Sequence, residues 1–393
     1  MSGERVAPGD AVALAAALVR VDSRNPSLVA GGPGEAPAAR LLAEILRDWG
    51  LRVTVAEAAP GRPNVVARAG AARPGAPTLM FNGHLDVVGV EGMAHAPFDA
   101  ERREGRLYGR GSADMKAGVA AMCAAAWRAA RAGLGGEVIV AAVADEEFES
   151  LGTRALLAAG VRADAAVVTE PTRLAVCPAH RGFAWIEVTV RGRAAHGSRY
   201  DLGVDAIRHA ALLMTELDAL EAGELVRRTH PLLGRASLHA ATIAGGTGWS
   251  TYPEACTLRV ERRTLPGETS DDAVREVEEA CARVRSRRPT FEASVRLDGG
   301  QRPSDVAPDA PVARALRAAL EAEGHPARVE GMSAWTDAAL LNDAGIPAIC
   351  FGPGDITLAH AAEEWVEVRE IEQATAVLAR VAETWCRERG FGV

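Results

Sequence analysis

The sequence predicts an α/β protein in two parts, a domain with a largely parallel sheet and an α+β unit inserted into it. Three observations support this fold class. The chain has 393 residues, more than one compact core of ordinary size, so we expect two domains. Strand and helix patterns alternate along the first part and return in the last part. The middle part has the order strand, helix, strand, strand, helix, strand, which is the ferredoxin-like arrangement.

The first part, residues 1–182, combines short apolar strands with apolar or alanine-rich helices. Asp10 precedes the first helix as an N-cap would, and Gly50, Gly133 and Gly160 end three later helices. The predicted helices are residues 11–19, 38–49, 117–132 and 153–159, and the predicted strands are residues 51–56, 64–69, 78–82, 138–143 and 165–169.

The middle part, residues 183–296, forms the predicted insertion. Residues 183–191 alternate between apolar and polar side chains, as a half-exposed strand does. The remaining predicted elements are helices at residues 204–220 and 271–284, and strands at residues 236–243, 255–262 and 291–297. The first domain resumes in residues 297–393, with helices at residues 311–322 and 368–388 and a short buried strand at residues 348–351.

Composition excludes several classes of function. The net charge is -8 with both signs mixed along the chain, which argues against binding nucleic acid or an anionic membrane. No apolar run reaches the roughly 18 residues that span a bilayer, and residues 11–19 predict a helix rather than a signal peptide. The six cysteines are scattered without a CxxC pair, which is typical of buried thiols in a reducing compartment. We therefore expect a cytoplasmic protein.

Polar residues follow three of the apolar strands, where open α/β sheets place their sites. His84 and Asp86 lie two residues apart, so His84 could bind a metal while Asp86 orients it. Glu146 and Glu147 sit in an acidic run whose charges repel, and they could divide the roles of general base and metal ligand. Glu170 follows the next strand. Taken singly, each segment also fits a polar turn or a solvated acidic loop.

Two further residues complete a possible metal site. Asp114 precedes the helix at residues 117–132, where an N-cap is the simpler interpretation, and His360 alone would be an ordinary surface or core histidine. Together, two histidines and three carboxylates match the ligands of a two-metal site. Imidazole and carboxylate ligands without thiolate favour zinc, with cobalt or manganese as alternatives.

The chain resembles the co-catalytic zinc metallopeptidase and deacylase family of acetylornithine deacetylase, succinyl-diaminopimelate desuccinylase, aminoacylase and carboxypeptidase G. The resemblance extends from near Ser23 almost to the C-terminus. The matching stretches are Gly83-His84-Leu85-Asp86-Val87-Val88, Gly109-Arg110-Gly111 through Asp114-Met115-Lys116-Ala117-Gly118, Asp145-Glu146-Glu147, Glu170-Pro171-Thr172, and His360 with Glu364. It implies a zinc-peptidase-like three-layer catalytic domain with an inserted ferredoxin-like lid and dimerisation domain.

The resemblance also implies roles for individual residues. The implied ligands of two zinc ions are His84 and Glu170 for one, Glu147 and His360 for the other, and Asp114 as the bridge, followed by a cis peptide bond. Asp86 is implied to orient a metal-bound histidine. Glu146 is implied to be the general base, which takes a proton from the attacking water and passes it to the leaving amine.

Residues of the inserted domain are implied to contact the substrate. His196 resembles a histidine that stabilises the oxyanion, in several family members from the partner subunit, although a hydrogen-bonded histidine at a strand end is the alternative. Arg263 resembles the arginine that binds a substrate carboxylate, while we expect Arg262 to face solvent. Thr336 lies in a segment that resembles part of the substrate pocket.

The sequence therefore predicts a homodimeric hydrolase with two zinc ions per subunit that cleaves the amide bond of a small N-acyl amino acid. A dipeptidase or carboxypeptidase of the same family is the first alternative. A non-catalytic, metal-binding dimer is the second, and Glu146 argues against it because such a protein needs no base. The residues do not rank acetyl, succinyl, formyl or aminoacyl groups.

Overall fold

The computed structural model describes residues 6–71 and 73–387, and the chain divides into two compact units. Unit 1 comprises the chain up to Pro178, together with Val306–Glu330 and the residues from Thr336 onward. Unit 2 comprises Ala179–Asp305 and Gly331–Trp335. We describe each unit by itself.

Unit 1 is built on a mixed sheet with the strand order β1-β2-β6-β3-β7-β17-β8. Its strands are β1 (Arg52–Ala59), β2 (Arg62–Gly70), β3 (Thr78–His84), β6 (Glu137–Val143), β7 (Ala165–Val168), β8 (Val176–His180) and β17 (Ala348–Cys350), and β16 (Val329–Met332) also pairs with β8. The four strands β6, β3, β7 and β17 run parallel to one another. The flanking strands β1, β2 and β8 are antiparallel to their neighbours.

The sequence predicted a largely parallel sheet, but the sheet is mixed. The turn between β1 and β2 is short and includes Gly61, which has a positive φ of 75°. So short a connection produces a hairpin, because parallel neighbours require a long crossover. The apolar content of a strand does not reveal its direction, and the prediction failed for that reason.

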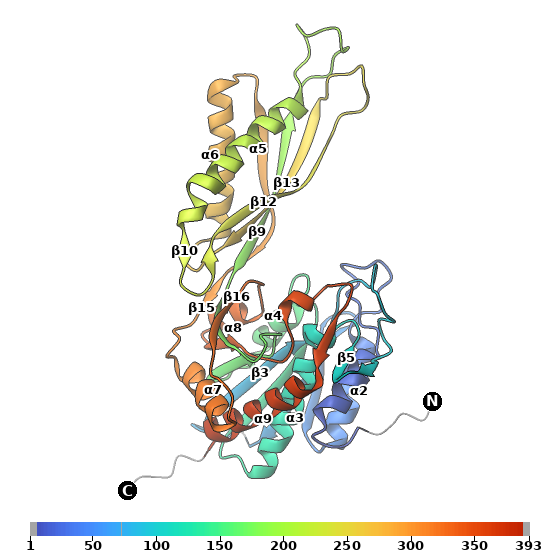
Figure 1. The fold of residues 1–393 in the computed structure, drawn as a ribbon, viewed down its shortest axis with the longest axis vertical. Helices are drawn as coiled ribbons and strands as arrows, with labels where there is room; N and C mark the ends of the chain where they lie inside the picture. Colours follow the sequence, from blue (N-terminus) through green and yellow to red (C-terminus); the bar gives the residue numbers. More distant parts are fainter. Residues whose placement is uncertain (1–5, 72, 388–393) are drawn as a thin grey trace. The chain divides into compact units, whose positions relative to one another are not determined.

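Helices cover both faces of this sheet (Figure 1). Leu79 and Phe81 point into the main core, which they share with α1 (Ala11–Val19), α2 (Ala36–Asp48), α3 (Ala117–Ala132), α7 (Pro311–Ala322) and α9 (Val368–Trp385). The alternate residue Asn82 points to the other face and donates a hydrogen bond to Thr153 of α4 (Leu151–Ala158), which packs beside α8 (Ala338–Asp343). The predicted three-layer α/β architecture is confirmed.

Several short elements of unit 1 were not predicted. Strands β4 (Arg102–Arg103), β5 (Arg106–Tyr108) and β18 (Trp365–Glu367) form a small separate sheet. The irregular segment η1 (Ser112–Lys116), in which Asp114 and Met115 have non-helical backbone angles, leads into α3, and η3 (Ile356–Leu358) precedes His360. Elements of two to five residues are too short to show a periodic apolar pattern, so no pattern in the sequence predicted them.

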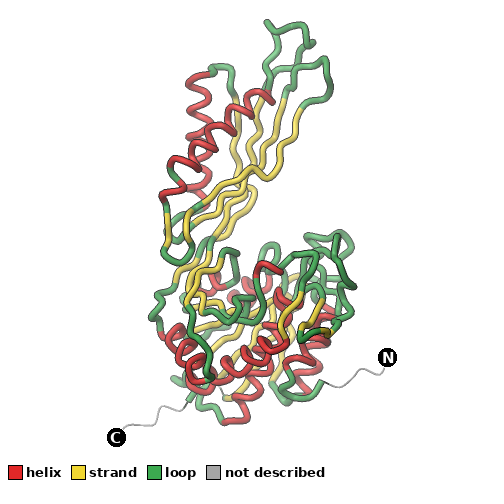
Figure 2. Tube along the Cα trace, in the orientation of Figure 1, coloured by secondary structure: helices red, strands yellow, loops and turns green. Residues whose placement is uncertain are grey.

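Unit 2 has the ferredoxin-like order that the sequence predicted. Its elements are β9 (Gly182–Arg191), α5 (Ala206–Gly223), β12 (Ser237–Gly245), β13 (Ala255–Thr264), α6 (Ser270–Arg287) and β14 (Glu292–Gln301). The antiparallel sheet has the order β12-β13-β9-β14, and both helices cover the same face of it (Figure 2). Ile186, Val188 and Val190 of β9 point into the core beneath the helices.

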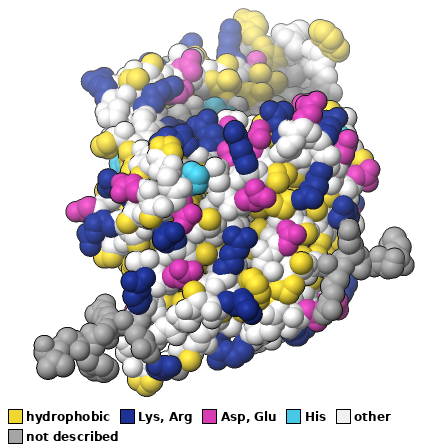
Figure 3. Space-filling view, turned by 60° about the horizontal axis from the view of Figure 1, so that its bottom comes forward, with side chains coloured by type: hydrophobic (Ala, Val, Ile, Leu, Met, Phe, Trp, Pro, Cys, Tyr) yellow, Lys and Arg dark blue, Asp and Glu magenta, His cyan; other side chains and the backbone are white. Residues whose placement is uncertain are grey.

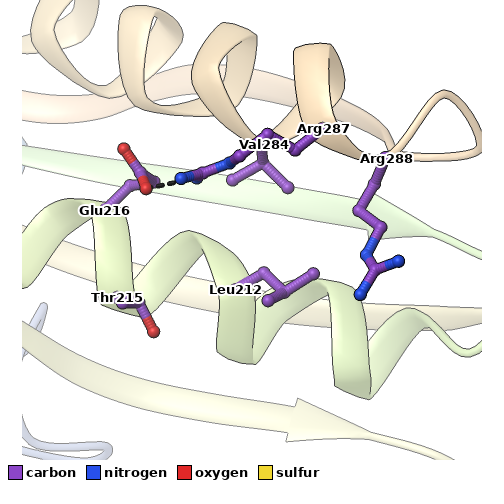
Figure 4. Close-up of a pocket in the computed structure, with 6 residues that line it drawn as sticks. All are labelled: Leu212, Thr215, Glu216, Val284, Arg287 and Arg288. Carbon is purple, nitrogen blue, oxygen red and sulfur yellow. Dashed lines mark hydrogen bonds and ion pairs between the residues drawn. The ribbon is translucent and has the colours of Figure 1, made fainter.

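Smaller features complete unit 2. The turn η2 (Leu225–Arg227) and the hairpin of β10 (Thr229–His230) and β11 (Gly234–Arg235) connect α5 to β12, and β15 (Ser304–Asp305) pairs with β8. A groove of about 430 Å³ lies between α5 and α6, where Arg287 donates a hydrogen bond to Glu216 (Figure 4).

Three findings concern the cysteines, the surface charge and the apolar helices. All six cysteines are free and buried. Basic and acidic side chains are interspersed over the face in Figure 3. Among the helices that the structure describes, none combines the length and the apolar character needed to cross a membrane.

Candidate metal centre

Three neighbouring strands of unit 1 end at one edge of the sheet and carry the candidate ligands. His84 is the last residue of β3 and pairs with Val143, the last residue of β6. The loop after β6 holds Glu146 and Glu147, and Glu170 follows β7, the other neighbour of β3. Because β6, β3 and β7 are parallel, their carboxyl ends bring these side chains together.

Asp114 lies between the two candidate histidines. Its Oδ1 is 3.1 Å from Nε2 of His84, and its Oδ2 is 3.4 Å from Nε2 of His360. His360 Nε2 also lies 3.1 Å from Oε2 of Glu147. The two oxygens of one carboxylate therefore face two imidazoles, which is the arrangement that a bridging ligand requires.

The donor atoms form two groups that could each hold a metal ion, and both include His84. The first consists of His84, Asp114 and Glu147, and the second of His84, Glu146 and Glu170. Within each group the donor atoms lie within 4.8 Å of one another. Oε1 of Glu170 is buried and has no hydrogen-bond partner, so a cation would satisfy it.

The electrostatics of the cluster favour bound cations. Four carboxylates, from Asp114, Glu146, Glu147 and Glu170, face two imidazoles. Burial and the nearby Glu170 raise the pKa of Glu146 well above its usual range, and burial and Asp114 do the same to the pKa of Glu170. Protein groups alone therefore leave the negative charge uncompensated, and the residues fit a site for divalent metal ions.

Asp86 holds the loop that carries the two glutamates. Its Oδ1 accepts a hydrogen bond from the backbone N–H of Glu146, and its Oδ2 accepts one from the N–H of Glu147, both at 3.2 Å. Nδ1 of His84 is 3.0 Å from the carbonyl oxygen of Asp86 and 3.6 Å from its Oδ1. Asp86 thus contacts both the histidine and the glutamate loop.

Glu364 fixes the segment that contains Asp114. The buried carboxylate accepts hydrogen bonds from the backbone N–H groups of Gly111, Ala113 and Asp114 at 3.0, 3.0 and 3.1 Å. It also accepts one from Nη1 of Arg110 at 2.6 Å. The peptide bond after Asp114 is cis, as the resemblance implies.

Some buried polar residues beside the cluster were not singled out from the sequence. Asp337 precedes α8 and accepts a hydrogen bond from Thr153 at 2.6 Å, and burial raises its pKa to about 6. Asn25, Glu35 and Arg62 contact the glutamate loop or its supports. They come from separate segments and form no motif, so only the tertiary structure reveals them.

Thr336 has a local role in unit 1. Its side chain is fully buried, and its Oγ1 accepts a hydrogen bond from the N–H of Ala338 at the start of α8. The same oxygen lies 3.2 Å from Sγ of Cys350. A contact between Thr336 and substrate stays a prediction.

The other predicted substrate residues lie in unit 2. His196 is exposed beyond the end of β9, with Nδ1 2.8 Å from Oγ of Ser198. Arg263 lies on β13 with its guanidinium over the ring of Phe183, 5.6 Å from the ring centre, and its Nε donates to Glu261. Their roles stay predictions.

The prediction that Arg262 faces solvent is wrong. Arg262 and Arg263 do point to opposite faces, but Arg262 is the buried one, with only 1% exposed. Its guanidinium donates to Glu276 at 3.0 Å and to Glu268 at 2.8 Å under the helical face of unit 2. The alternation of side chains along the strand places the two arginines on opposite faces. It does not show that one of them forms ion pairs with buried carboxylates.

The sequence is similar to a known family of metallopeptidases and to characterised relatives. The profile described as "Peptidase family M20/M25/M40" matches residues 80–384. An acetylornithine deacetylase from Myxococcus xanthus is 33% identical over 331 residues, which cover 83% of this chain and 85% of the relative. An N-formyl-4-amino-5-aminomethyl-2-methylpyrimidine deformylase from Bacillus subtilis is 28% identical and covers 88% of this chain and 89% of its own.

The crystal structure of aminopeptidase PepT from Bacillus cereus has the same fold. It superposes with a TM-score of 0.79 over 97% of this chain and 99% of its own, at 21% identity. The profile match spans well over half of the sequence, and the deacetylase is similar along most of both chains. The chain belongs to peptidase family M20/M25/M40, a family of hydrolases.

Proposed function

We propose that the protein is a dinuclear zinc amidohydrolase that removes the acyl group from a small N-acyl amino acid. The observation that carries this proposal is the position of Asp114 between His84 and His360, beside the uncompensated Glu146. The similarity to an acetylornithine deacetylase supports an N-acyl amino acid as the substrate class.

The family resemblance implies the ligand sets, and the contacts in the cluster support them. His84 and Glu170 would hold one zinc, Glu147 and His360 the other, and Asp114 would contribute one oxygen to each. Cobalt or manganese could replace zinc at oxygen and nitrogen ligands. When bound, such a metal pair lowers the pKa of a water molecule and polarises the amide carbonyl.

Glu146 is the proposed general base. Its Oε2 lies 3.8 Å from Nε2 of His84, at the edge of the ligand cluster. Because burial and neighbouring carboxylates raise the pKa of Glu146, its carboxylate is a better proton acceptor than an exposed glutamate. It takes a proton from the attacking water and gives it to the nitrogen of the leaving amine.

Arg263 and His196 are the proposed substrate residues of unit 2, and their separation supports a homodimer. Arg263 pairs with Phe183 near the start of β9, whereas His196 follows Arg191 at its other end. Eight residues of strand span about 26 Å. One copy of unit 2 cannot place both side chains on one small substrate, so we assign Arg263 to the substrate carboxylate and His196 of a partner subunit to the oxyanion.

A hydrolysis screen tests the proposal. Zinc-loaded protein would be assayed with N-acetyl, N-formyl and N-succinyl amino acids and with dipeptides, while bound metal is measured by atomic emission. We expect two zinc ions per chain, release of acyl groups, and loss of all activity after chelation. Turnover of dipeptides alone would show a peptidase instead. Activity that survives complete metal removal would reject the metal-dependent mechanism.

A further inference from the structure

A buried ion pair lies behind the glutamate loop, outside the candidate ligand cluster. Arg62, at the start of β2, donates from Nε to Glu35 Oε2 at 2.5 Å and from Nη2 to Glu35 Oε1 at 2.6 Å. Glu35 is fully buried and Arg62 is 8% exposed. Burial opposes the charge on Arg62, but Glu35 and Asp145 outweigh it and raise the pKa of Arg62. A two-point contact of this kind has a defined direction as well as strength.

Both members of this pair form hydrogen bonds with Asp145, the residue directly before the proposed base. Nη2 of Arg62 also donates to Oδ1 of Asp145 at 2.8 Å, and the N–H of Asp145 donates to Oε1 of Glu35 at 3.2 Å. Asp145 has a φ of 67°, a left-handed conformation that residues other than glycine adopt uncommonly. The pair therefore holds both the side chain and the backbone at the point where the chain turns toward Glu146.

Asn25 connects this pair to the support on the other side of the loop. Its Nδ2 donates to Oδ1 of Asp145 at 3.0 Å and to Oδ2 of Asp86 at 2.8 Å. The carboxylate of Asp86 in turn accepts hydrogen bonds from the backbone N–H groups of Glu146 and Glu147. Asn25 is fully buried, and its own N–H donates to the carbonyl of Val87 at 2.9 Å. One amide thus joins the two carboxylates that bracket the loop.

We propose that Asn25 and Arg62 are positioning residues that set the direction of the base, Glu146. Neither belongs to the two candidate ligand groups, and both act on Glu146 through Asp145 and Asp86. The inference rests on the proposed function for its effect on rate. The effect on the loop itself is independent of the reaction.

The first test measures the loop without any assay of activity. Asn25→Ala removes both donors of the connecting amide. We expect amide hydrogen exchange in residues 145–149 of the metal-free protein to rise about tenfold, because the Glu146 and Glu147 N–H groups lose a fixed acceptor. Asn342→Ala is the control, since the Asn342 side chain also donates and accepts hydrogen bonds, both of 2.9 Å with the backbone of Ala348 in β17. If amide hydrogen exchange in residues 145–149 rises equally in both variants, the proposal is overturned.

The second test measures kinetics and metal binding on the substrate found in the screen. We expect Asn25→Ala to lower kcat by about 10- to 100-fold with KM within about threefold, because a small misplacement of a catalytic group has effects of this size. Metal content should stay at the wild-type value. Arg62→Lys keeps the charge but not the two-point contact, so its kcat should fall less than that of Asn25→Ala. Asn342→Ala should keep the wild-type kcat per folded molecule.

Two results of the second test would reject the inference. One is an Asn25→Ala enzyme whose kcat, per folded and metal-loaded molecule, equals that of Asn342→Ala. The other is a loss of bound metal that accounts for the whole loss of rate, since the residue would then support ligands instead of the base. If the wild-type protein hydrolyses nothing in the screen, the proposed function fails, and the exchange experiment still decides whether Asn25 positions the loop.

Discussion

Each of the two units contains a cluster of mostly buried charged side chains, and the clusters differ in their balance of charge. In unit 2, Arg262 and Arg228 contact Glu276 and Glu268, so two positive groups match two negative ones. In unit 1, four carboxylates surround two imidazoles. A balanced cluster satisfies itself, whereas an acid-rich cluster needs cations or protons from outside. The comparison suggests that the first cluster supports the fold and the second supports chemistry.

The largest expected effect tests the chemical role of the acid-rich cluster. Glu146→Gln should lower kcat by about 10²- to 10⁴-fold, the usual contribution of a general base. The unfolding free energy of the metal-free variant should be equal to or greater than that of wild type, because burial already disfavours the charged form of Glu146. Steady-state kinetics and urea denaturation measure both quantities. Glu149→Gln, in the same loop but exposed, is the control, and a wild-type kcat in Glu146→Gln would contradict the assignment.

The next effect tests the balanced cluster. Arg262→Met should lower the unfolding free energy by about 3 kcal/mol, because it removes the buried arginine from the cluster and leaves only the partly exposed Arg228 to balance Glu276 and Glu268. Arg263→Met removes a neighbouring arginine that is one-third exposed, so its unfolding free energy should change by less than about 1 kcal/mol. Denaturant unfolding of both variants measures the difference. Equal losses of unfolding free energy in the two variants would show that the burial of Arg262 does not determine its contribution to stability.

Two buried histidines, one in each unit, have pKa values shifted in opposite directions. Burial would lower the pKa of His84, but Asp114 and the other carboxylates raise it well above the ordinary value. His180 lies at the end of β8 that belongs to unit 2, where it has no such partner, and burial lowers its pKa to about 4. His180 therefore favours the folded state while it is neutral, and this stability is lost as pH falls from about 6.5 to about 4.

That difference predicts a measurable dependence of stability on pH. A shift of this size corresponds to about 3 kcal/mol. Urea denaturation between pH 7 and pH 4.5 should show a smaller loss of stability in His180→Phe than in wild type. Identical pH profiles for the two proteins would mean that His180 is not buried in its neutral form.

The smallest expected effect concerns an exposed cap in unit 2. Thr269 and Asp272 bond reciprocally at the start of α6, and Thr269 and Arg275 lower the pKa of Asp272 to about 2. This contribution is present above the ordinary pKa of aspartate, about 3.8, and is lost as pH falls toward 2. Asp272→Asn should lower the Tm slightly at pH 7, and the difference should shrink at pH 3. A difference independent of pH would exclude the charge of Asp272 as its cause.

The sequence predicted most long elements, because helices and strands of eight or more residues carry clear periodic patterns. α3, α7 and the four strands of unit 2 lie close to their predicted ranges. It missed α8, β8 and β16, which are short, and the direction of β1 and β2. It also placed Arg262 in solvent, since a strand pattern shows which residues share a face but not which face is covered.

For the candidate site, residue type and strand pattern were enough to predict the chemistry of the donors and their places after strands. His84, Glu146, Glu147 and Glu170 follow apolar segments, and parallel strands bring such residues to one edge. Two arrangements become visible in the folded chain: Asp114 lies between two imidazoles, and Asn25 joins Asp86 to Asp145. The physical reason is that hydrogen bonds between distant segments depend on the packing of the whole unit. Local sequence patterns encode faces and ends, but not which side chains meet across the fold.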